Sequence, residues 1–140
     1  EDSHDICELV QTTTLDKLLV SEQNISLIKI DVEGYEKKVL LGCEKTLQNP
    51  NLQVIIIELN NSSLNYNYDE NETIAILNKY GFLPYRYIYP GNTLASLEKK
   101  NYKSHNTIFI RNINYVKKKI EQKLVTINKN TVKFTNSSII

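Results

Sequence analysis

The hydrophobic positions of the chain include two short runs, one at residues 27–30, where only Lys29 is polar, and one at residues 54–57, where no residue is polar. Both are bounded by polar residues, and the second consists of four β-branched residues. Such runs are typical of strands covered on both faces, as in a parallel sheet. We therefore expect two strands that are adjacent, parallel and the most buried in the fold.

Three other segments have the spacing of helices. Thr14 is expected to cap a short helix that begins at Leu15. The apolar positions between the two strands fall on one helical face and predict a helix from 35 to about 47, after a turn at 31–34. A further helix is expected over 69–80, where the next residue is a glycine suited to a left-handed helix end.

Further strands are expected at 6–12, 83–89 and 107–110, the last two as an antiparallel pair. Alternation of strands and helices predicts an α/β fold with a mostly parallel sheet and an antiparallel last strand. One domain is expected over 1–112. A basic extension, a helix followed by a tail, is expected over 113–140.

Composition agrees with one soluble globular domain. The chain has 140 residues, of which 41% are hydrophobic and 24% charged. No apolar stretch is long enough to span a membrane and the first residues do not resemble a signal peptide, so a cytoplasmic location is expected. Cys7 and Cys43 are expected to be free thiols in a reducing compartment.

Charge is distributed unevenly along the chain. Residues 1–97 carry a net charge of −7 and residues 98–140 a net charge of +8. A basic tail can contact nucleic acid or membranes, but a solvated lysine-rich tail is the simpler interpretation. Nucleic acid is therefore not an expected partner.

Two carboxylates directly follow the two best strands, Asp31 after the first and Glu58 after the second. Because ligands bind beyond the carboxyl ends of parallel strands, both carboxylates are expected to face one crevice. They could serve there as a general base, a metal pair or a polar clamp on a hydroxyl group. The alternative is that one or both only cap the following helix or loop. Glu33 and Glu36 are expected to be surface acids near a helix amino terminus.

Several linked motifs occur in a fixed order over about fifty residues. They closely resemble the FkbM-like methyltransferases, and the resemblance continues more loosely to Ile110 through a helix and a late strand that follows Asn106. The motifs are Thr13-Thr14-Leu15-Asp16, then Leu27-Ile28-Lys29-Ile30-Asp31-Val32-Glu33-Gly34-Tyr35-Glu36, then Val39-Leu40-x-Gly42, then Ile55-Ile56-Ile57-Glu58.

The resemblance implies a Rossmann-like, class I methyltransferase sheet of seven strands that binds S-adenosyl-L-methionine. It implies transfer of a methyl group to a hydroxyl of a sugar, glycan or secondary metabolite. Asp31, Val32 and Tyr35 are the expected cofactor contacts, and Asp31 and Glu58 are the expected catalytic residues. Asp31, Glu58 and Asn60 together offer an oxygen-only site that would suit a divalent cation such as Mg²⁺ or Ca²⁺.

The chain departs from the family pattern in its first part. None of its four glycines lies in a G-x-G turn, and the family's first three strands have no counterpart. A fragment is therefore expected, inactive by itself, whose partner is the missing amino-terminal half of the same domain. A degenerate domain that acts as a catalytically inactive α/β binding module is the alternative.

Overall fold

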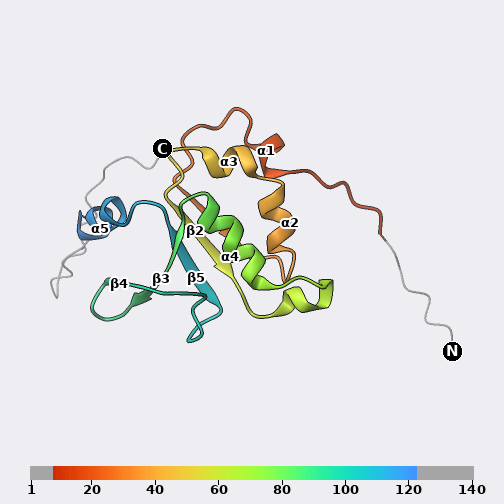
Figure 1. The fold of residues 1–140 in the computed structure, drawn as a ribbon. Coiled ribbons are helices and arrows are strands. Elements are labelled where there is room, and N and C mark those ends of the chain that lie inside the picture. The colour runs from red at the N-terminus through yellow and green to blue at the C-terminus, as the bar shows by residue number, and fades with distance from the viewer. Residues whose placement is uncertain (1–7, 123–140) are drawn as a thin grey trace, which may run out of the picture.

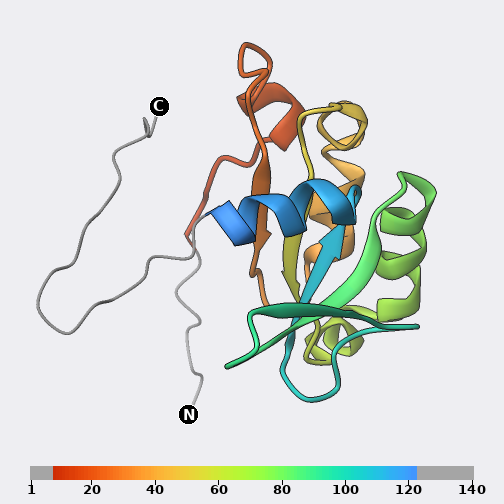
Figure 2. The same cartoon turned by 90° about the vertical axis from the view of Figure 1, so that its left-hand side faces the viewer.

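The computed structural model describes residues 8–122, which form a five-stranded sheet with helices on both faces (Figure 1). Helices α2, α3 and α4 cover one face, and α5 crosses the other (Figure 2). The predicted α/β class is confirmed. In chain order the elements are α1 (Leu15–Leu18), β1 (Leu27–Ile30), α2 (Glu36–Leu41), α3 (Glu44–Gln48), β2 (Val54–Glu58), the 3₁₀ helix η1 (Ser62–Tyr66), α4 (Glu70–Lys79), β3 (Leu83–Ile88), β4 (Thr93–Ser96), β5 (Asn106–Ile110) and α5 (Ile113–Gln122).

The strand order is β1-β2-β5-β3-β4. β1 and β2 are parallel neighbours, as predicted, with Leu27 opposite Val54 and Ile30 opposite Ile57. The expectation of a mostly parallel sheet is wrong, because the other neighbouring pairs of the described sheet are antiparallel. The predicted alternation of strands and helices stops after α4, because β3, β4 and β5 follow one another without a helix between them. β4 and β5 lie on either side of β3 and both run opposite to it, so β5 is also antiparallel to its other neighbour, β2.

Burial differs between the two predicted central strands. Ile55 and Ile57 of β2 are fully buried, whereas Leu27 of β1 is 50% exposed. β1 is an edge strand of the described sheet, with β2 as its neighbour on one side only. The expectation that β1 is among the most buried strands is therefore wrong.

The single helix predicted over 35–47 is two helices, α2 and α3, separated at Gly42. A Cβ atom at Gly42 would lie 3.2 Å from the methyl group of Thr14, so α1 packs closely against this break. The carboxylate of Asp16 accepts hydrogen bonds from the backbone N–H groups of Lys45 (3.0 Å) and Thr46 (2.8 Å). Burial acts to raise the pKa of Asp16, but these hydrogen bonds outweigh it and lower that pKa. The α1 segment thus supplies the amino-terminal cap of α3, which explains why a new helix begins there.

The other local predictions are mostly confirmed. Thr14 caps α1, and the helix predicted over 69–80 is α4 (Glu70–Lys79). Asp69 caps α4 together with Glu72 in a capping box, which was not predicted. Gly81 has a φ of 81°, in the left-handed region. The strand predicted over 6–12 is wrong for residues 8–12, which have no regular structure, and its first two residues lie outside the described range. β4 was not predicted, because only its two central residues, Leu94 and Ala95, are apolar.

Cys43 is a free, buried thiol, and burial raises its pKa to about 12. Cys7 lies outside the described residues. The predicted carboxyl-terminal helix is α5 up to Gln122, and the predicted tail also lies outside the described residues. None of the described helices is long and apolar enough to cross a membrane.

Candidate functional site

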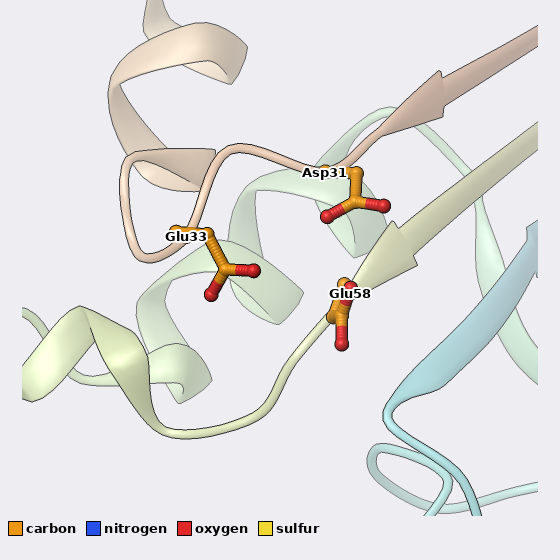
Figure 3. A group of neighbouring side chains, drawn as sticks. All are labelled: Asp31, Glu33 and Glu58. Carbon is orange, nitrogen blue, oxygen red and sulfur yellow. The ribbon is translucent and has the colours of Figure 1, made fainter.

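Three carboxylates meet where β1 and β2 end. Asp31 follows β1, Glu58 is the last residue of β2, and Glu33 lies on the turn that leaves β1 (Figure 3). One carboxylate oxygen from each residue lies within 4.8 Å of the others. The structure therefore brings the predicted pair together and adds Glu33, for which sequence reasoning expected only a surface role.

Gly34 allows the turn after β1 to pack directly against the segment after β2. Gly34 has a φ of 102°, and a Cβ atom there would lie 2.6 Å from the carbonyl oxygen of Ser62. Only glycine tolerates both that conformation and that approach. Its N–H donates a 3.0 Å hydrogen bond to Glu36, which is buried, so the expectation that Glu36 is a surface acid is wrong.

Asn60 supports Glu33 through its side-chain amide. Its Nδ2 donates to Glu33 Oε2 at 3.2 Å, and its Oδ1 accepts a 2.9 Å hydrogen bond from the backbone N–H of Ser62. Because a backbone N–H can only donate, this contact determines which way the amide is turned. The Asn60 oxygen thus faces Ser62. The oxygen that accompanies Asp31 and Glu58 in this arrangement belongs to Glu33.

The two predicted catalytic carboxylates have opposite pKa shifts. The pKa of Asp31 is lowered, first by the hydrogen bond from Lys29, whose ammonium lies 2.5 Å away, and then by a hydrogen bond from Glu58. The pKa of Glu58 is raised by that same hydrogen bond to Asp31, by desolvation, and by the negative charges of Asp31 and Glu33. The pair therefore combines an ionised acceptor with a group that keeps its proton to higher pH.

A cavity of about 460 Å³ runs along the outer side of β1 next to Asp31 and Val32. These two predicted cofactor contacts share that cavity. Tyr35 is not part of its lining. Its ring instead packs edge-on against Tyr66 of η1, with the ring centroids 4.3 Å apart.

β5 provides the other neighbour of Glu58. Asn106 is the register partner of Glu58, and the backbone N–H of Leu59 donates to the carbonyl oxygen of His105 at 2.8 Å. Directly opposed residues of an antiparallel pair lie on the same face of the sheet. Asn106 therefore borders the carboxylate site, and its Oδ1 is buried without a hydrogen-bond partner. Sequence reasoning missed this because it did not predict that β5 lies next to β2.

Comparison with known proteins identifies the family. The sequence matches the Methyltransferase FkbM domain over residues 2–84, more than half of the chain, and this stretch contains all three carboxylates. The match ends in β3, so β4, β5 and α5 lie beyond it. No curated protein and no solved structure is significantly similar to the chain. On the strength of the domain match and the motifs that the structure brings together, the chain belongs to the FkbM methyltransferase family.

Proposed function

We propose that the protein is an S-adenosyl-L-methionine-dependent O-methyltransferase acting on a hydroxyl of a sugar, glycan or secondary metabolite. Membership of a methyltransferase family supports the reaction type. The observation that carries the proposal is the meeting of Asp31, Glu33 and Glu58 at the carboxyl ends of two neighbouring parallel strands. That edge of an α/β sheet is where ligands bind.

The residues at this edge fit the proposed cofactor, which supplies an electrophilic methyl group on a positively charged sulfur. The ionised carboxylate of Asp31 complements positive charge, and Val32 offers an apolar side chain that is 39% exposed. Both border the cavity beside β1. We propose Asp31 and Val32 as cofactor contacts, with Tyr35 as a third contact from the far side of the turn.

For the chemistry, we propose that Asp31 orients the acceptor hydroxyl and takes its proton as the new carbon–oxygen bond forms. An in-line displacement mainly requires that the hydroxyl oxygen be held close to the methyl carbon, at about 3–3.5 Å. Glu58 is the proposed partner of Asp31, because their carboxylate oxygens lie within 4.8 Å of each other and each carboxyl group shifts the pKa of the other. Both side chains are accessible from solvent, so an acceptor can reach them.

We expect the 140-residue chain alone to bind S-adenosyl-L-methionine weakly or not at all. It has no G-x-G turn, and β1 has an unpaired outer edge within the described sheet. We propose that a preceding part of the same domain pairs with this edge and supplies the remaining contacts. Each lost polar contact typically costs about 1–3 kcal/mol, or roughly one to two powers of ten in affinity. Isothermal titration calorimetry tests this, and micromolar affinity would show that the cofactor site is misplaced.

A divalent cation, Mg²⁺ in the first place, is a further proposed component of the site. Carboxylate oxygens are its preferred ligands, and Asp31 and Glu58 are joined here by Glu33. Asn60, the third ligand expected from the sequence, would have to turn its amide to bind a cation, because its Nδ2 group donates to Glu33 and its oxygen faces Ser62.

Adding Mg²⁺ or Ca²⁺ should therefore raise the melting temperature of the chain, and a chelator should reverse the shift. The effect should weaken as the pH falls, because Glu58, whose pKa is raised, then holds a proton that competes with the cation. Glu33→Gln should reduce the shift more than Asn60→Ala if Glu33 is the third ligand. An unchanged melting temperature at millimolar cation would exclude the metal.

We also propose that the protein works in the cytoplasm, where Cys43 remains a reduced thiol.

A further inference from the structure

A buried ion pair joins the β4–β5 loop to the start of α4. The ammonium of Lys100 lies 2.5 Å from Glu70 Oε2, and the two side chains are only 12% and 10% exposed. The same ammonium donates to the carbonyl oxygen of Leu59 at 3.3 Å and to Asn61 Oδ1 at 2.7 Å. All three donors of the lysine are therefore used within the protein.

Glu70 completes the network with its second oxygen. Its Oε1 accepts a 2.6 Å hydrogen bond from the backbone N–H of Asn61. Leu59 and Asn61 are thus both held by the ion pair, and Asn60, between them, is the residue whose amide contacts Glu33. The segment after β2 cannot shift without breaking several charge-assisted hydrogen bonds.

This ion pair differs from the others in the described part of the chain. The Lys29–Asp31 pair has side chains that are 53% and 38% exposed, and one partner of the Lys37–Glu72 pair is 52% exposed. Exposed pairs contribute little to stability. A buried pair loses much of its electrostatic attraction to the cost of removing both charges from water. Its main effect is therefore often to hold the chain in one arrangement, and not to raise the free energy of unfolding.

We propose that Lys100 is a positioning residue for the carboxylate site. By holding Leu59 and Asn61, it keeps Asn60 in the orientation that places Glu33 beside Asp31 and Glu58. Lys100 lies beyond the stretch that matches the family domain, so this part of the site is built by β4–β5 sequence that the match does not cover. Its relevance to catalysis rests on the proposed function of the three carboxylates.

The test is NMR spectroscopy of the Asn60 side-chain amide in the full 140-residue chain. In Lys100→Met, the Asn60 Nδ2 proton that is bonded to Glu33 should move upfield toward the position of an exposed asparagine, because the hydrogen bond is lost. The side-chain amide of Asn51 is the internal control. It donates a 2.8 Å hydrogen bond to the carbonyl oxygen of Gln23, in which Lys100 takes no part, so its NMR signal should not shift. Lys100→Arg should restore the Asn60 signal, and Lys99→Met, at the exposed neighbouring position, should leave it unchanged.

An unchanged Asn60 signal in folded Lys100→Met would overturn the proposal. Lys100→Met could fail to fold because Glu70 is left unpaired. The double variant Lys100→Met/Glu70→Gln then removes the buried charge, and its Asn60 signal is measured instead. A shifted Asn60 signal supports the positioning role, and an unshifted one overturns it. The measurement needs neither cofactor nor acceptor. Its failure is therefore distinguishable from a failure of the proposed methyl transfer, which activity measurements detect.

Discussion

Replacing Asp31 by asparagine should lower the turnover of the intact methyltransferase by about 10²- to 10⁴-fold and leave its melting temperature almost unchanged. Asn has the same shape as Asp and caps a helix about as well, so a merely structural Asp31 would tolerate the change. A residue that takes a proton would not, because the amide has no basic oxygen of comparable strength. Turnover with a radiolabelled methyl donor and thermal unfolding are the two measurements.

Two variants make this result specific. Glu58→Gln removes the partner carboxylate and should also lower turnover, which places both residues in one site. Asp16→Asn is the structural control. The substitution replaces one carboxylate oxygen of residue 16 by an NH₂ group, which cannot accept the hydrogen bond from the backbone N–H of Lys45 or of Thr46. That should cost about 1 kcal/mol of stability and leave turnover largely intact. Wild-type turnover in Asp31→Asn would make Asp31 a structural residue and the site assignment wrong.

Gly34→Ala should lower the free energy of unfolding by about 4 kcal/mol, the sum of backbone strain and overpacking. The new methyl group would lie 2.6 Å from the Ser62 carbonyl oxygen and 2.9 Å from the Ser63 nitrogen, both of which are backbone atoms that cannot rotate away. For a domain of this size the melting temperature should fall by roughly 15 °C. Urea unfolding of the variant measures the effect directly.

Gly81→Ala is the matched control for that substitution. Gly81 also has a positive φ, 81°, but a Cβ atom there would meet nothing within 4 Å. Its cost should therefore be the conformational strain alone, about 1–2 kcal/mol. Equal losses in the two variants would show that the contact between the Gly34 turn and the Ser62 segment does not hold the site together.

Local patterns predicted the parts of the fold that depend on neighbouring residues. The apolar runs of β1 and β2 and the helical spacing of α4 can be read within a few residues, and the two strands place Asp31 and Glu58 at one edge of the sheet. Strand direction and edge position could not be predicted in this way. A run such as Thr107-Ile108-Phe109-Ile110 indicates burial, but nothing in it indicates that β5 lies between β2 and β3 and runs antiparallel to both.

The remaining parts of the site depend on contacts between distant residues. Glu33 joins the carboxylates because Asn60, 27 residues away, donates to it. Lys100 meets Glu70 across 30 residues, and Arg111 donates to the carbonyl oxygens of Asn49 and Leu52 across about sixty residues. No local spacing in the sequence signals such partners, because they depend on which loops the fold brings together.

The location of the cofactor is the central claim, and a titration of S-adenosyl-L-methionine into the ¹⁵N-labelled intact methyltransferase tests it most directly. Even weak binding shifts the amide resonances of contacting residues. We predict that the largest shifts occur at Asp31 and Val32, and that Asp31→Asn reduces them. The contradicting result is a set of shifts centred on Leu27, Val54 and Val116, which line a separate cavity of about 720 Å³ beneath α5, with Asp31 and Val32 unaffected.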